Sequence, residues 1–148
     1  MKMNFTVLSR LLQSTRGLLL SGYAAFAFSF MLLLLQSNSP GLYRFSALLF
    51  CLLLLAAHHY LSMRALFDAR LLEALAQSEQ QLHEITADLD QSLIQFKLMP
   101  QAKAGRGWTE RLQGCIRLFK AQACLLFMQY LVLICLAFWT LTINHQAI

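Results

Sequence analysis

Three long apolar runs are the feature that most constrains the fold of this 148-residue chain. They lie at about residues 17–36, 42–63 and 121–143, and each is long enough to cross roughly 30 Å of hydrocarbon as a helix. Because 58% of the residues are hydrophobic, the chain is far more apolar than a soluble domain of this size requires. The sequence therefore predicts an all-α membrane protein with three transmembrane helices.

A short turn, SNSPG, joins the first two apolar runs at residues 37–41. Proline followed by glycine ends a helix and reverses the chain, so we expect residues 17–63 to form an antiparallel transmembrane hairpin. Basic residues precede the first run, as they do in a signal peptide. That run is too long for a signal peptide and a second span follows it closely, so we expect it to remain as a span.

The positions of the 12 Lys and Arg residues predict the orientation in the membrane. Three precede the first span, one (Arg44) follows the short turn, and eight lie between the second and third spans. Because cytoplasmic loops carry the excess of basic residues, we expect the N-terminus and residues 64–120 in the cytoplasm and the C-terminus outside. This describes a multi-pass protein of a bacterial-type inner (plasma) membrane. No basic run is interleaved with aromatic residues, so nucleic acid is not an expected partner.

The segments outside the spans have their own helical patterns. Residues 1–16 are predicted to form an amphipathic lead-in on the membrane surface, with apolar residues at helical spacing: Phe5, Leu8, Leu11 and Leu12. Residues 64–99 are predicted to form one long amphipathic helix, because nothing breaks a helix before Pro100. Residues 100–120 are expected to form a basic linker and an interfacial helix, and residues 121–148 the third span with a short external tail.

An apolar stripe follows the predicted cytoplasmic helix at coiled-coil spacing. Its members are Leu71, Leu75, Leu82, Ile85, Leu89 and Phe96. A stripe of this kind packs on a second copy, a partner or the membrane surface, so these are predicted partner-binding residues. The sequence leaves open whether this helix continues the second span and whether it breaks near Ser78 or Thr86, where helix-capping residues occur.

Small residues recur at every fourth position of the first span, at Gly17, Ser21, Ala25 and Ser29. Side chains four apart share one face of a helix, so this series forms a shallow groove that accepts another helix. The groove is predicted either to bind a partner membrane protein or to pack against the other spans of the same chain. Gln129, inside the third span, is also predicted to hydrogen-bond across a helix interface.

Two adjacent histidines, His58 and His59, stand where the second span loses its apolar character. They are predicted to mark the cytoplasmic boundary of the membrane. The alternative is a haem ligand, which would make the protein a haem-binding anchor. Neighbouring residues point about 100° apart on a helix, so one pocket does not easily use both.

The sequence contains no recognisable constellation for catalysis, metal binding or a cofactor. No ionisable residue occupies the middle of a span, so a proton relay or ion pathway has no residues to use. The phosphate-binding, nucleophile-elbow and zinc-protease motifs are missing. We therefore expect a non-enzymatic accessory or scaffold subunit that binds partner membrane proteins, or forms a homo-oligomer, through the first span and the cytoplasmic helix.

The overall layout also suggests a second class of function. In size, basic charge and number of spans, the whole chain resembles class I phage holins and the small polytopic colicin immunity proteins, although it shares no motif with either. The resemblance implies a self-assembling pore or an inhibitor of a membrane-inserting toxin. The predicted orientation departs from that of class I holins, whose N-terminus lies outside and whose basic tail lies inside.

Overall fold

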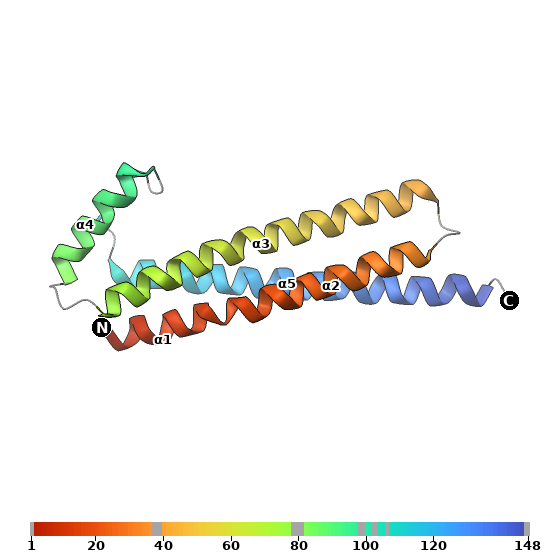
Figure 1. Cartoon of the computed structure of the whole chain (residues 1–148), viewed down its shortest axis with the longest axis horizontal. Helices are drawn as coiled ribbons and strands as arrows, with labels where there is room; N and C mark the ends of the chain where they lie inside the picture. The colour runs from red at the N-terminus through yellow and green to blue at the C-terminus, as the bar shows by residue number, and fades with distance from the viewer. Residues whose placement is uncertain are drawn as a thin grey trace.

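The computed structural model of the chain is all-helical across the residues it describes (Figure 1). These are residues 2–36, 40–77, 82–97, 100–101, 104–105 and 107–146, without the side chains of 2, 82–85, 88–89 and 143–146. The helices are α1 (Lys2–Gln13), α2 (Thr15–Leu35), α3 (Gly41–Gln77), α4 (Leu82–Gln95) and α5 (Trp108–Gln146).

A bundle of α2, α3 and α5 forms the body of the molecule, and each of these helices packs against the other two. The α3 helix runs back along α2, while α5 runs in the same direction as α2 (Figure 1). Within the described part of the chain, three helices are long and apolar enough to cross a membrane. The all-α prediction is confirmed, and the three predicted spans fall on helices that are long and apolar enough to cross a membrane, which suggests contact with a lipid bilayer.

Polar residues mark both ends of the apolar part of each long helix. The markers are Arg16 and Gln36 for α2, Arg44 and Arg64 for α3, and Lys120 and Thr140 for α5. The members of each pair are 20 residues apart, which corresponds to about 30 Å of helix and to the thickness of the hydrocarbon core. Gln36 Nε2 donates a hydrogen bond of 2.7 Å to Thr140 Oγ1, so two of the markers lie at the same level. We take these pairs as the limits of the membrane-spanning segments.

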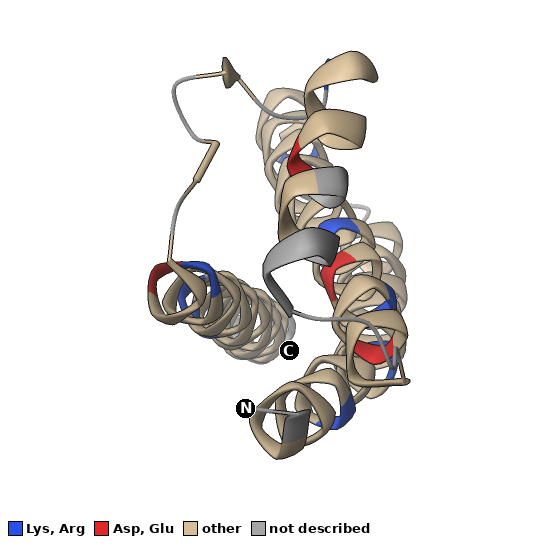
Figure 2. Cartoon of the chain, turned by 90° about the vertical axis from the view of Figure 1, so that its left-hand side faces the viewer, with Lys and Arg blue, Asp and Glu red and all other residues tan. Residues whose placement is uncertain are grey.

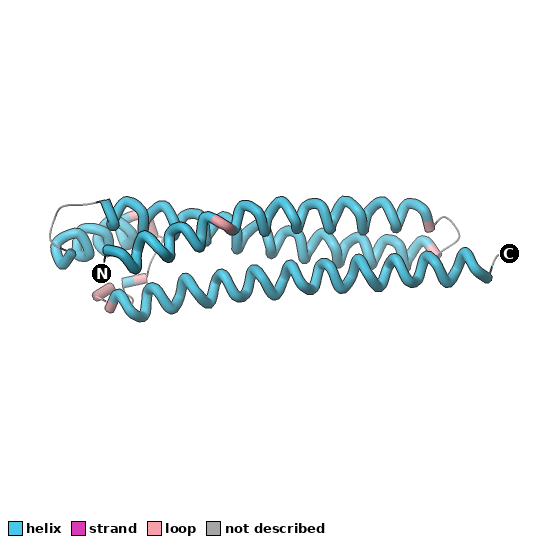
Figure 3. Tube along the Cα trace, turned by 90° about the horizontal axis from the view of Figure 1, so that it is seen from below, coloured by secondary structure: helices cyan, strands magenta, loops and turns pink. Residues whose placement is uncertain are grey.

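The first helix, α1, packs one face against α3 and leaves its other face exposed. It precedes α2 almost in line, with a short break at Ser14 (Figure 3). The hydroxyl groups of Ser14 and Thr15 donate to the carbonyl groups of Leu11 and Leu12, a local bond that competes with the helix and bends it. Three of the four apolar residues predicted for membrane contact are buried in a cluster with α3 instead, namely Phe5, Leu8 and Leu12. The fourth, Leu11, is 42% exposed.

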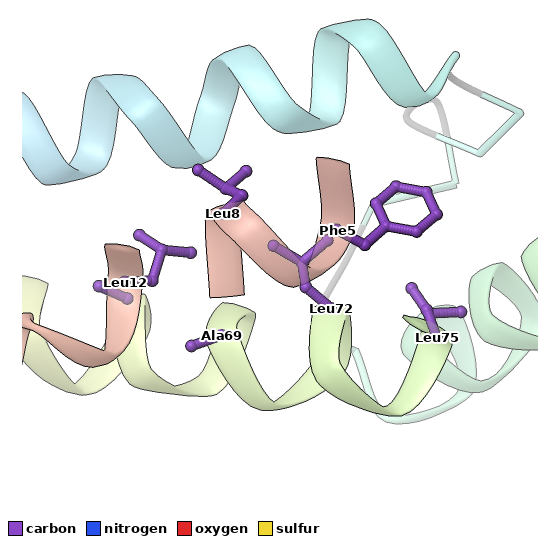
Figure 4. Packing of buried hydrophobic residues seen from close by; sticks show 7 residues of the cluster. Phe5, Leu8, Leu12, Ala69, Leu72 and Leu75 are labelled. Carbon is purple, nitrogen blue, oxygen red and sulfur yellow. The ribbon is translucent and has the colours of Figure 1, made fainter. Parts of the chain in front are cut away.

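The sequence left open whether the cytoplasmic helix continues the second span. It does, because α3 runs unbroken through the second span to Gln77. Its final part buries Ala65, Ala69, Leu72 and Leu75 against α1 (Figure 4). The single long helix predicted for residues 64–99 is therefore wrong: its first part is the end of α3, and α4 is a separate helix of 14 residues. The sequence allows a break near Ser78 or Thr86. Ser78 itself lies outside the described residues, between the end of α3 at Gln77 and the start of α4 at Leu82, and Thr86 lies within α4.

The segment predicted as an interfacial helix belongs to α5. This helix begins at Trp108 and continues without interruption into the third span. Leu112, Cys115 and Leu118 pack against the α1–α3 cluster, which gives this section of α5 an apolar contact within the chain. The bundle consequently continues past Arg64 and Lys120, beyond the membrane-spanning segments.

Truncation of Leu12 tests whether α1 is part of this core. Leu12→Ala should destabilise the protein by about 2–4 kcal/mol, because it opens a cavity between α1 and α3. Leu11→Ala is the matched control, since Leu11 is 42% exposed on the same helix. Thermal unfolding in mild detergent measures both variants, and equal losses would contradict the buried position of Leu12.

Candidate functional site

A layer of polar residues crosses the bundle at Gly22 of α2. At its centre is His58 of α3, which is 0% exposed. The ring atom Nδ1 of His58 lies 3.0 Å from Oε1 of Gln129 on α5. The prediction that Gln129 hydrogen-bonds across helices is therefore confirmed.

Two more buried polar side chains extend this contact along the bundle. Gln122 Nε2 donates to Ser62 Oγ at 2.7 Å and lies 3.4 Å from Nε2 of His58. Ser62 Oγ in turn donates to the carbonyl oxygen of His58 at 2.8 Å. These partners fit a neutral imidazole whose Nδ1–H donates to Gln129 and whose Nε2 accepts from Gln122. The group His58, Ser62, Gln122 and Gln129 is called the polar core below.

Gly22 is the residue that lets α2 approach the polar core. A Cβ atom at this position would lie 2.7 Å from Nδ1 of His58 and 2.9 Å from Oε1 of Gln129. Both distances are shorter than real Cβ contacts, so any side chain would push the histidine or the glutamine away. Gly22 is buried, whereas nothing lies within 4 Å of a Cβ placed on Gly17.

The two neighbours of Gly22 each make a further hydrogen bond to another helix. Ser21 Oγ lies 2.7 Å from the hydroxyl of Tyr130 on α5, and the hydroxyl of Tyr23 lies 2.8 Å from Nδ1 of His59 on α3. Three consecutive residues of α2 therefore meet polar groups of both other helices at one level. In hydrocarbon, hydrogen bonds of this kind hold helices together where the hydrophobic effect does not.

The depth of this layer follows from the helix markers. Gly22 is six residues from Arg16, and His58 is six residues from Arg64, or about 9 Å along the helix axis. His58 thus lies between helices inside the apolar segment, where the sequence predicted a boundary residue. His59 is exposed, and the expected divergence of the two adjacent side chains is confirmed.

The surroundings of His58 do not suit a haem iron. Both ring nitrogens face glutamine side chains, and the backbone of Gly22 closes the space beside Nδ1. Among the described residues, no group of three or more His, Cys, Asp or Glu side chains is placed to hold a metal ion. The geometry therefore favours a helix-joining role for this histidine.

The small-residue face of α2 packs mainly against other helices of the same chain. Ala25 and Ser29 are buried at 1% and 2% exposed, Ser21 is half-buried and Gly17 is exposed. Because α3 and α5 cover this face, its buried part is not open to a partner protein. This is the internal packing that the sequence left as one of two alternatives.

The predicted leucine stripe does not form one continuous surface. Leu75 is buried in the α1–α3 core, Leu71 is half-buried, and Phe96 is 72% exposed just after α4. The side chains of Leu82, Ile85 and Leu89 lie outside the described residues. The stripe is divided because α3 ends at Gln77 and α4 begins as a separate helix.

A second set of polar contacts, which we call the α4 latch, joins α4 to the start of α5. Arg111 Nη2 lies 2.7 Å from both carboxylate oxygens of Asp90, and the backbone N–H of Gly105 donates to the same carboxylate at 2.9 Å. Trp108 Nε1 donates to Thr86 Oγ1 at 3.0 Å. Figure 2 looks onto this end of the molecule, where acidic and basic residues occur on neighbouring helices.

Trp108 connects this latch to the α1–α3 core. Its ring meets that of Phe5 edge-on, with centroids 4.9 Å apart, and the Arg111 guanidinium lies 5.2 Å above it. An arginine that both stacks on an aromatic ring and pairs with a carboxylate is held in one geometry. The position of α4 is therefore tied to α1 as well as to α5.

Cys115 and Asp68 form a pair beyond Lys120 and Arg64, outside the membrane-spanning segments. The thiol donates to Asp68 Oδ2 at 3.9 Å. Burial, together with the adjacent Asp68 charge, raises the pKa of Cys115 to about 11, and burial also raises the pKa of Asp68. The thiol therefore stays protonated at neutral pH and is a poor nucleophile.

No known protein family matches the chain, and comparison with curated proteins and with solved structures gives no match. Any proposal about function must therefore rest on the geometry of the chain itself.

Sequence reasoning did not identify Gly22, Ser62 and Gln122 as parts of a site. The available signal was spacing, because His58 and Ser62 are four residues apart and Gln122 and Gln129 are seven apart, each pair on one helix face. The α4 latch gave no such signal, since Asp90 and Arg111 lie on different helices. Its charges are of the kind that usually face water.

Adding a methyl group at Gly22 tests the polar layer. Gly22→Ala should destabilise the protein by about 1–3 kcal/mol, because the new Cβ displaces His58 or Gln129. Gly17→Ala, on the same helix but in open space, should be neutral or slightly stabilising because alanine favours a helix. The measurement is thermal unfolding in detergent, and a neutral Gly22→Ala would show that the helices do not approach closely there.

Removing one charge tests the α4 latch. Asp90→Asn should increase tryptic cleavage between residues 97 and 106 about tenfold, because a charge-assisted hydrogen bond contributes about 1.5–3 kcal/mol. Glu110→Gln, an exposed acid next to Arg111, serves as the control. Cleavage rates followed by mass spectrometry that are the same in the two variants would refute the latch.

Proposed function

We propose that this chain is a non-enzymatic accessory or scaffold subunit of a bacterial-type inner membrane. In this role it binds a partner membrane protein through the end of the molecule that carries α4. The observation that carries the proposal is that its buried polar side chains hydrogen-bond to one another. The polar core satisfies most of its hydrogen bonds within the bundle, while α4 is held at the bundle end by a latch.

The charge distribution supports the orientation assumed in this proposal. Eleven of the 12 basic residues lie in segments before the first span or between the second and third. By the positive-inside rule, this distribution supports a cytoplasmic position for those segments, and with them for α1, α4 and the start of α5. A cytoplasmic partner or the cytoplasmic part of a membrane protein would then meet α4.

The chemistry of the described side chains offers little for catalysis. The nitrogens of His58 are engaged by glutamines, and the Cys115 thiol is protonated at neutral pH. Asp90 is engaged with Arg111. Each of these groups is engaged by another side chain of the protein and does not face a substrate cavity. This favours a binding role over an enzymatic one.

Among the described residues, two exposed surfaces suit a partner. One is the end of α4, where Phe96 is 72% exposed. The other is the outer face of α2, where Phe28 is 60% exposed and Ala24 and Ala27 allow a close approach of another helix. A self-assembling pore is less well supported, since exposed side chains such as Phe28, Leu53 and Phe138 are apolar and give no water-lined stripe.

Photo-crosslinking in cells tests the scaffold proposal. A photo-reactive residue at Phe96, and another at Phe28, should each trap the same foreign protein, and that protein should copurify with the wild-type chain at near-equal amount. The control position is Leu72, which is 4% exposed and should trap only this chain. If Phe96 and Phe28 also trap only copies of this chain, the scaffold proposal fails and self-assembly replaces it.

A further inference from the structure

A small cavity lies next to the polar core, on the side away from Gln122 and Ser62. It has a volume of about 10 Å³ and is lined by Phe26, Ser29, Cys51, Leu54, Gln129 and Val132. This volume is close to the least that holds one water molecule. A water site in hydrocarbon also needs polar walls, and two of these six residues supply them.

Gln129 supplies the hydrogen-bond donor. Its side chain is 5% exposed, and its Oε1 is engaged by His58. Its Nε2 is buried and has no hydrogen-bond partner within the described part of the chain. A buried amide N–H without a partner is costly, most of all in a membrane, so an acceptor beside it would stabilise the bundle.

Ser29 supplies the acceptor on the facing helix. Its hydroxyl donates to the carbonyl oxygen of Ala25 at 2.9 Å, which leaves the lone pairs of Oγ available. Ser29 is 2% exposed and lines the same cavity as Gln129. A molecule that accepts from an amide and donates to a hydroxyl would therefore complete both groups.

We propose that this cavity binds one water molecule, which accepts a hydrogen bond from Gln129 Nε2 and donates one to Ser29 Oγ. The volume suits one water molecule, and water matches the donor and the acceptor. The site is independent of the accessory function proposed above.

The bound water changes what holds α2 in the bundle. The polar core itself joins α3 to α5, and α2 contributes the close approach of Gly22. Through the water, Ser29 joins the same hydrogen-bonded chain, which then runs from Ser62 and Gln122 through His58 and Gln129 to α2. The first span is thus linked to the other two by a polar contact seven residues beyond Gly22.

A high-resolution crystal structure of the full-length protein grown in a lipid mesophase tests this directly. Density for one ordered water within hydrogen-bond distance of both Gln129 Nε2 and Ser29 Oγ is the expected result. An empty cavity in a map that resolves other buried waters would overturn the proposal. No variant is needed for this measurement.

A double-mutant cycle gives a second test. Cys51→Val fills the cavity with apolar atoms and expels the water, so it should lower the melting temperature by about 4 °C in the presence of Gln129. In a Gln129→Met background there is no amide to leave unpaired, and Cys51→Val should have no such effect. Cys135→Val, on the exposed side of α5, is the matched control and should not depend on residue 129. Equal effects of Cys51→Val in both backgrounds would overturn the proposal.

Discussion

Hydrocarbon offers no hydrogen-bond partners, so polar groups inside the apolar segments must find them within the chain. The contact between His58 and Gln129 is the main example here, since it joins α3 to α5 in the interior of the bundle. The rest of the arrangement depends on it. Gly22 must lack a side chain for α2 to reach this contact, and Ser21 and Tyr23 then bond to the two helices on either side. Apolar packing alone would allow the spans to slide or rotate, whereas these directional bonds fix one register.

The spans and the hairpin could be predicted because they depend on local properties. An apolar run of 20 residues crosses a membrane whatever its neighbours are, and the turn at Pro40 and Gly41 reverses the chain for local steric reasons. The position of α1 could not be predicted in this way. Its apolar face would suit a membrane surface as well as another helix, and the outcome depends on α3 continuing far enough to offer Ala65 and Ala69.

The polar core illustrates the same limit at the level of side chains. The sequence shows that His58 follows an apolar run, which is compatible with a boundary or with the interior. The interior position depends on Gln122 and Gln129, more than 60 residues away, and on which face of α5 turns inward. The hydrogen bonding of Gln129 was predictable because an amide inside a span needs a partner, although its identity was not. The division of the leucine stripe could not be predicted for a related reason. A heptad pattern indicates which residues share one face of a helix, but it does not indicate where the helix ends.

The length of α3 has a mechanical consequence. A helix of 37 residues is a rod about 55 Å long, and it runs without a break from Gly41 at one end of the bundle to Gln77 at the other. The polar layer contacts α3 near its middle, at His58. A tilt of the helix by about 10° would displace one end sideways relative to the other by about 10 Å. A rigid helix of this length would therefore transmit a tilt about the polar layer from one end of the bundle to the other.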